Sequence, residues 1–283
     1  MKNIFKFVFC FFLTCFISVF SCFSQEKSHY KCAYQFDFLS DTVTMDYFRR
    51  EIYMVQIGNN LTKGFIYQKF CLDSLNKVSS CLFHQMFIES LNKGMDAMRK
   101  TGDAKRLSHS GINNGAFNSD LYKDYLKDEI RVKNNINTHS FIYKDEFKTQ
   151  DWEILSDTVT IFGYYCQKAK CHWRGRDWEA WFTPEIPISE GPWKFYGLPG
   201  LIIKIYDTKK HYSFELIGFQ KTEEPINSKI PEGIQQIERK EFVRMAFGKK
   251  GEFFLETEML MLGLSDKESI KANYDYIELD YNE

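Results

Sequence analysis

Three residues in the middle of the chain have the chemistry of metal ligands: Cys166, Cys171 and His172. Thiolate and imidazole groups bind zinc and copper. On a regular strand, however, positions 166 and 171 differ in parity, so their side chains point to opposite faces of a sheet. The spacing therefore favours a structural role for both cysteines, as a buried thiol or as half of a disulfide with a distant strand. No metal and no other cofactor is predicted.

Three carboxylates follow shortly after, at Asp177, Glu179 and Glu185. Paired carboxylates can divide general acid and general base work when their surroundings separate their pKa values. Asp177 and Glu179 share a strand face beside a turn, which favours two solvated side chains instead. No serine lies in a G-x-S-x-G elbow, and neither His172 nor His211 has an evident serine or cysteine partner. No catalytic residue is predicted, and a metal-dependent or carboxylate hydrolase stays the alternative.

Four tryptophans crowd the same region, beside a loop with three prolines. Aromatic side chains next to irregular loops can line a groove for a sugar, a peptide or a lipid. Large aromatic residues are usually buried, so a place in the core is the preferred interpretation. The candidate groove residues are Trp173, Trp178, Trp181 and Trp193.

The loop ends in the sequence GLPGLI, and the four residues 198–201 match a type II β-turn. Proline presets the backbone at the first central position, and glycine accepts the positive φ required at the second. The strand that follows places Leu201, Ile203 and Ile205 on one face, and the sequence HYSFELIGF returns as its hairpin partner. The motif is predicted to be structural, with binding as the alternative. Its residues are Gly197, Leu198, Pro199, Gly200, Leu201 and Ile202.

Most of the chain around these residues alternates apolar and polar residues, which is the pattern of β-strands. This pattern covers residues 30–57, 65–70 and most of 141–182, where RGRD at 174–177 is a predicted turn. Helical spacing is found over 74–100 and again over 238–248. We therefore expect a mainly β or α+β protein with a curved antiparallel sheet, extending to a half-open barrel, and one or two packed helices.

Length and composition limit the classes of protein. The 283 residues are 44% hydrophobic and 17% aromatic, which is enough for one large core. The 37 Lys and Arg nearly balance the 38 Asp and Glu, so the chain lacks the positive charge of a nucleic-acid binder. One domain over residues 25–283 is expected.

Residues 1–24 have the pattern of a secretory signal peptide, with two lysines before a short apolar run. Cleavage before Gln25 is the preferred interpretation, and lipidation of Cys22 is the second. Export to the periplasm or outer membrane places five cysteines in an oxidising compartment, so at least one disulfide is expected. These are Cys32, Cys71, Cys81, Cys166 and Cys171.

The pieces GYYCQKA, GRDWEAWF, PEIPISEGPWKF and GLPGLI together resemble the GLPGLI family, most strongly over Gly163–Phe219. The resemblance implies an exported protein of Bacteroidota without an assigned activity. One departure is Lys210, where a turn glycine is common in the family.

We therefore expect a non-enzymatic protein of the cell envelope that binds a hydrophobic small molecule or a partner protein. No nucleic-acid partner is expected. A further alternative is an outer-membrane assembly factor. Such a factor would associate with the outer membrane.

Overall fold

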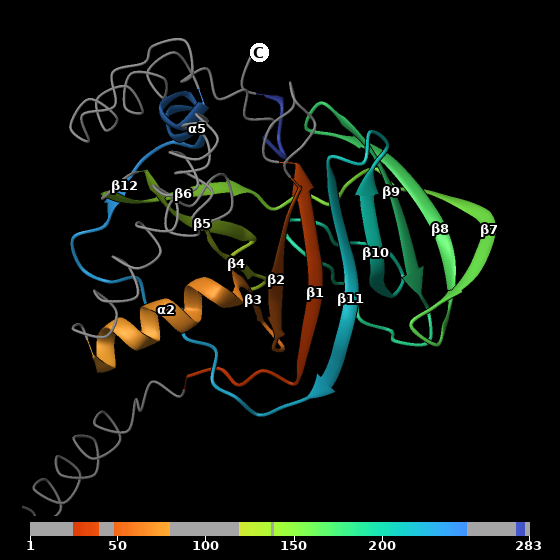
Figure 1. Cartoon of the computed structure of the whole chain (residues 1–283), viewed down its shortest axis with the longest axis horizontal. Helices are drawn as coiled ribbons and strands as arrows, with labels where there is room; N and C mark the ends of the chain where they lie inside the picture. The colour runs from red at the N-terminus through yellow and green to blue at the C-terminus, as the bar shows by residue number, and fades with distance from the viewer. Residues whose placement is uncertain (1–24, 40–47, 80–118, 137–138, 248–275, 281–283) are drawn as a thin grey trace, which may run out of the picture.

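The computed structural model describes residues 25–39, 48–79, 119–136, 139–247 and 276–280. The signal-peptide prediction, Cys81, and nearly all of the predicted loop at 101–120 lie outside these residues. The described part of the chain forms twelve strands and two helices, whose arrangement is shown in Figure 1. The elements are β1 Tyr30–Leu39, β2 Phe48–Ile57, β3 Leu61–Ile66, α2 Tyr67–Val78, β4 Asp120–Asp124, β5 Glu129–Ile136, β6 His139–Glu146, β7 Glu153–Ile161, β8 Tyr164–Trp173, β9 Arg176–Thr183, β10 Leu201–Asp207, β11 Tyr212–Lys221, β12 Gln235–Gln236 and α5 Arg239–Phe247.

All the strands belong to one sheet, in the order β12-β6-β5-β4-β3-β2-β1-β11-β10-β9-β8-β7. Every neighbouring pair is antiparallel except the short β12, which runs parallel to β6. The prediction of a mainly β fold with an antiparallel sheet and one or two helices is confirmed. Most consecutive strands are neighbours in the sheet, and short turns connect several of these antiparallel pairs, such as β7–β8 and β8–β9.

Several predicted boundaries differ from the structure. The strand expected over 65–70 ends at Ile66, because the ladder between β2 and β3 stops at the pair Tyr53–Ile66. The next residues satisfy their backbone groups in α2, so this helix begins at Tyr67 instead of near Ser74. The charged stretch 123–136, which gave no clear sequence signal, contributes to β4 and forms β5.

The predicted turn at RGRD is confirmed, and its geometry explains the tight hairpin between β8 and β9. Arg174 and Gly175 have φ values of 52° and 73°. Two consecutive positive φ values are typical of a type I′ turn, whose twist matches that of the flanking strands. Phe162 and Gly163, at 52° and 80°, form the equivalent turn between β7 and β8.

The segment 184–200, between β9 and β10, packs against one face of strands from both halves of the sheet. Lys123 of β4 donates to the carbonyl oxygen of Phe195 over 3.2 Å. On the other half, the indole of Trp178 in β9 lies 4.6 Å from the ring of the same Phe195. A short loop can contact strands so far apart in the sheet order only if the sheet curves around it. The sheet is therefore open and curved, as Figure 1 shows, and this loop packs on its concave face.

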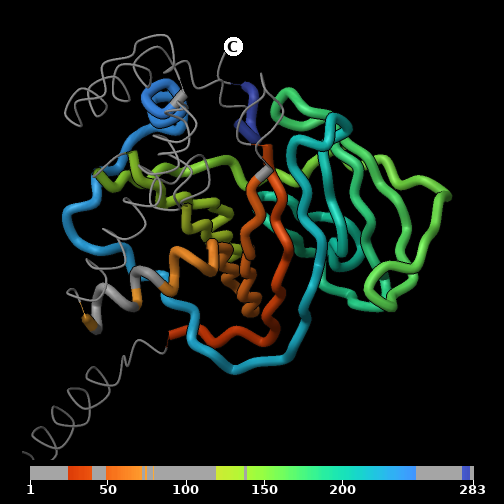
Figure 2. Tube along the Cα trace, in the orientation of Figure 1, coloured from red at the N-terminus to blue at the C-terminus, as the bar shows by residue number. Residues whose placement is uncertain are grey.

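The other end of the chain returns to this core. Figure 2 shows residues 276–280, in dark blue, beside the turn that joins β8 to β9. The amide of Leu279 donates to the carbonyl oxygen of Arg174 over 2.8 Å. Tyr276 and Ile277 are both fully buried, so this C-terminal segment is part of the core.

Candidate functional site

The GLPGLI motif forms a tighter turn than the sequence predicts. The amide of Gly200 donates to the carbonyl oxygen of Leu198 over 2.8 Å, which closes a three-residue γ-turn centred on Pro199. The predicted type II turn is wrong, because the amide of Leu201 instead donates to Ile186 over 3.0 Å. Gly200 accordingly has a φ of 156° and not a value near 80°.

Glycine is still required at position 200, but for a close approach of two backbone segments. A Cβ atom there would lie 2.0 Å from the carbonyl oxygen of Thr183 and 3.1 Å from the Cα of Pro184. The motif thus lets the start of β10 pack against the end of β9. Leu198, Leu201 and Ile202 are at most 1% exposed, while Gly197 and Pro199 lie at the surface.

The four tryptophans do not together line an open groove. Trp178 and Trp193 are 0% and 1% exposed, so they present no surface to a ligand. Trp173 and Trp181 are partly buried against the same core cluster. Trp173 and Trp178 both contact Phe195, which makes these two indoles a support for the 184–200 loop.

The cysteines and His172 are not brought together as metal ligands. Cys166 and Cys171 are buried, whereas the side chain of His172 is 69% exposed. Among the described residues, no group of three His, Cys, Asp or Glu side chains is placed to hold a metal ion.

The expected disulfide is wrong for the cysteines that the structure describes, because all four are free thiols. Cys32 lies in β1, Cys71 is exposed on α2, and Cys166 and Cys171 both belong to β8. Burial raises the pKa of the Cys171 thiol to about 12, so this sulfur stays protonated and unreactive.

The three candidate carboxylates each have a different partner. Asp177 lies 2.8 Å from Nδ1 of His172, and the amide of Tyr165 donates to Glu185 over 2.7 Å. Glu179 accepts a hydrogen bond from the hydroxyl of Tyr206 over 2.7 Å, which lowers the pKa of Glu179. Each carboxylate therefore lies in a different local setting. The three carboxylates do not form an acid–base pair.

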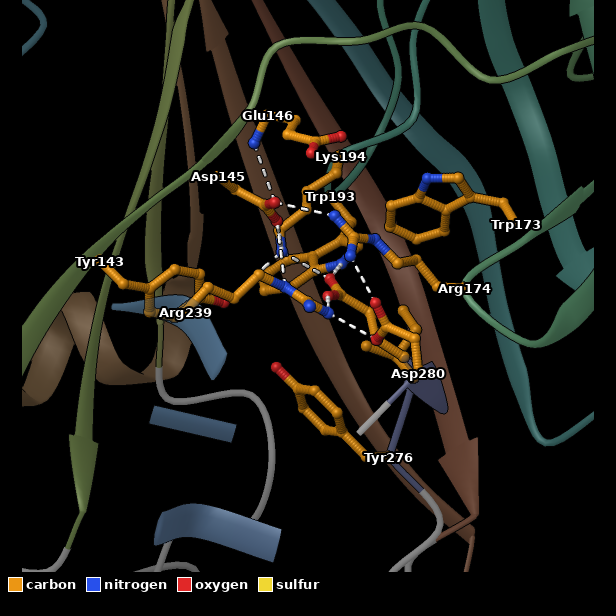
Figure 3. Close-up of polar contacts among 12 residues, drawn as sticks. Tyr143, Asp145, Glu146, Trp173, Arg174, Trp193, Lys194, Arg239, Tyr276 and Asp280 are labelled. Carbon is orange, nitrogen blue, oxygen red and sulfur yellow. Dashed lines mark hydrogen bonds and ion pairs between the residues drawn. The ribbon is translucent and has the colours of Figure 1, made fainter. Parts of the chain in front are cut away.

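A largely buried cluster of six charges lies where the C-terminal segment docks (Figure 3). Three cations and three carboxylates alternate in it, so the charges balance. Lys194 of the loop lies 2.5 Å from Asp145 of β6 and 2.6 Å from Glu278, and Arg239 of α5 lies 2.6 Å from Glu278. We call this set the ionic cluster. Its members are Asp145, Arg174, Lys194, Arg239, Glu278 and Asp280.

The electrostatics of the ionic cluster favour the charged forms. Burial disfavours ionisation of Asp145, yet the positive charges of Lys194, Arg174 and Arg239 prevail and lower its pKa to about 2. Burial likewise disfavours the charged form of Lys194, but the two carboxylates around it raise its pKa. Removing one partner would leave an uncompensated buried charge, so the cluster fixes how five separate segments meet.

A small polar pocket of about 200 Å³ opens beside the ionic cluster. Asp145, Arg174 and Lys194 form part of its wall, together with His172 and Trp173. Its volume is below the range typical of sites for drug-sized ligands. Asp145, Arg174 and Lys194 already have partners within the ionic cluster, so these three wall residues are not available to a ligand.

A larger and more open groove of about 810 Å³ lies elsewhere, where the first residues of β1 meet the 184–200 loop. Tyr30, Ile57, Pro187 and Ile188 supply its apolar surface, and Tyr30 is held by stacking on Phe219 at 5.3 Å. Polar residues complete the lining. We call this site the loop groove, and its polar residues are His29, Asn59, Lys221, Thr222 and Glu223.

Sequence reasoning missed both the ionic cluster and the loop groove. Lys194 and Glu278 are far apart in the chain, and each looks like an ordinary surface charge. A signal was present for Lys194, which stands between Trp193 and Phe195 in an otherwise apolar run. A lysine in that position must either reach solvent or pair with a carboxylate.

Comparison with known proteins gives a family match over part of this region. A family model described as "Protein of unknown function (Porph_ging)" matches residues 173–204, which include the 184–200 loop and the GLPGLI motif. This stretch lies inside the run that resembles the GLPGLI family. The comparison with curated proteins finds no match.

Two solved structures are similar to the chain at low identity. "Structure of PNGF-II in C2 space group" has 15% identity and a TM-score of 0.47, covering 75% of this chain and 31% of that one. "Structure of PNGF-II in P21 space group" has 15% identity and a TM-score of 0.48, with 77% and 33% covered. The chain thus spans about a third of the length of these structures.

Proposed function

We propose that this protein is an exported member of the GLPGLI family that binds a partner polypeptide in the loop groove and has no catalytic role. Export is supported by the signal-peptide pattern of residues 1–24, and family membership by the motif run around the matched residues 173–204. Among the helices of the described residues, none is long and apolar enough to cross a membrane.

The observation that carries the proposal is the composition of the loop groove. Its apolar part comes from Tyr30, Ile57, Pro187 and Ile188, and its polar part includes both a lysine and an acid. An apolar centre with a polar rim is typical of protein interfaces. The groove is open to solvent, which suits a polypeptide better than a small molecule that must be enclosed.

The support for a polypeptide over a hydrophobic small molecule comes from the concave face of the sheet. In a carrier, that face would enclose the ligand. Here Trp193 and Phe195 of the 184–200 loop lie there, at 1% and 0% exposure. The surface that remains for binding is therefore the part of the loop where Pro187 and Ile188 line the loop groove.

Site-specific photo-crosslinking in the native envelope tests the proposal. A photoreactive amino acid replaces Asn59 in the groove, and a control places it at Leu126, which is 76% exposed on the β4–β5 turn. We expect a discrete polypeptide adduct from position 59 and none from position 126. A lipid adduct at position 59, or equal labelling from both positions, would contradict the proposal.

A matched pair of variants tests whether the polypeptide adduct depends on the loop groove. Pro187→Asp places a charge on its apolar surface, whereas Pro184→Asp changes another exposed proline of the same loop, which lies outside the groove lining. We expect the adduct to be lost only with Pro187→Asp.

A further inference from the structure

The C-terminal segment Tyr276–Asp280 is held like a bound peptide. It lies between the β8–β9 turn, β9, the 184–200 loop and α5, and belongs to no strand of the sheet. The guanidinium of Arg176 donates to the carbonyl oxygen of Tyr276 over 2.6 Å and to that of Ile277 over 3.2 Å. One arginine therefore holds the backbone of the segment.

The side chains of the segment are recognised by charge. Both oxygens of Glu278 are occupied, one by Trp193 Nε1 at 3.0 Å and Lys194 Nζ at 2.6 Å, the other by Arg239 Nη2 at 2.6 Å. Asp280 lies 2.6 Å from Arg239 and is also paired with Arg174. Two acids separated by one residue thus meet three cations from three different elements.

The surface that holds the segment is shaped for it. Gly175 at the tip of the β8–β9 turn has no side chain, and a Cβ atom there would lie 2.9 Å from the Cβ of Leu279. Tyr276 and Ile277 are fully buried. We call this surface the C-terminal slot, and it is distinct from the loop groove.

We propose that the C-terminal slot is a recognition site for an acidic peptide segment, and that a second copy of this chain can supply it by exchanging residues 276–280. Residues 248–275 connect the segment to α5. That connection can reach on the order of 90 Å when fully extended. Occupants from the same chain and from a second copy make identical contacts, so protein concentration decides between them.

A labelled peptide tests the recognition step. The full chain from Gln25 is incubated with a fluorescent peptide of residues 273–283, and anisotropy is followed with time. We expect the peptide to enter faster than the protein unfolds globally, and unlabelled peptide to compete with it. A peptide carrying Glu278→Gln and Asp280→Asn should bind at least tenfold more weakly. Entry only at the rate of global unfolding, or equal binding of both peptides, would overturn the proposal.

The same protein tests the exchange between copies. Light scattering coupled to size exclusion should show a dimer fraction that rises with protein concentration and falls when excess peptide is added. Arg239→Ala removes a cation that holds Glu278 and Asp280, so the chain's own segment should leave the slot more readily and the rate of entry of the labelled peptide should rise. Lys144→Ala, a 57% exposed side chain next to Asp145, should leave it unchanged. A monomer at every concentration, despite peptide entry, would overturn exchange between copies.

Discussion

Replacing Gly200 by alanine should be one of the most damaging single-methyl changes in this protein. The added Cβ would lie 2.0 Å from the carbonyl oxygen of Thr183 and 2.6 Å from its carbonyl carbon. Both obstacles are backbone atoms of β9, so they cannot rotate away. The junction of β9 with β10 must shift, and the pairing of Leu201 with Thr183 is lost with it.

The expected cost combines backbone strain with the lost contacts at this junction. A non-glycine residue at such a φ costs about 1–3 kcal/mol, and the displaced strand adds to it, which gives about 3–5 kcal/mol in total. Chemical denaturation measures this free energy directly. In a thermal melt it corresponds to a fall of roughly 6–20 °C for a chain of this size.

Gly163→Ala is the matched control. Gly163 also has a positive φ, of 80°, but a Cβ atom there would have nothing within 4 Å. Its replacement should therefore cost only the strain, about 1 kcal/mol. If Gly200→Ala costs no more than Gly163→Ala, the close approach of β9 and β10 is not a constraint and the reasoning about the motif fails.

Three further predictions follow from burial, backbone geometry and charge. Ile203→Ala should cost about 2–5 kcal/mol in a denaturant titration because Ile203 is 0% exposed, whereas Ile217→Ala, at a 46% exposed position, should cost less than 1 kcal/mol. Lys210→Gly should raise the unfolding free energy by about 1 kcal/mol, because Lys210 has a φ of 62°; an unchanged or lower value would contradict this. The pKa of Asp145 is lowered to about 2 in the folded state, so its contribution of about 2 kcal/mol is present above pH 4 and lost as the pH falls towards 2. Asp145→Asn should remove that part of the pH dependence in melts at a series of pH values, and an unaltered profile would count against the ionic cluster.

The sequence was informative wherever local rules decide the structure. Alternation identified the strands from 141 onward, and the turn at RGRD could be placed because Gly175 accepts a positive φ. Glycine is common at the position of Lys210 in the family that the chain resembles, and the φ of 62° at Lys210 explains why.

Long-range contacts could not be read in the same way. The prediction of a type II turn is wrong because the amide of Leu201 donates to the carbonyl oxygen of Ile186. No local sequence rule predicts that hydrogen bond. The ionic cluster joins residues from 145 to 280, so each charge looked solvated in its own segment. Curvature was predicted, but what fills the concave face depends on where the 184–200 loop folds back.

Hydrogen exchange at the start of β10 tests most directly the central claim that the GLPGLI motif is part of the core, where the 184–200 loop holds it. The amides of Leu201 and Ile202 donate to Ile186 and Glu190, both over 3.0 Å. We predict that these two amides exchange as slowly as those in the middle of β1 and β11, by global unfolding. Exchange at the rate of an exposed loop would contradict the account, because the concave face would then be open and the motif free to bind a ligand itself.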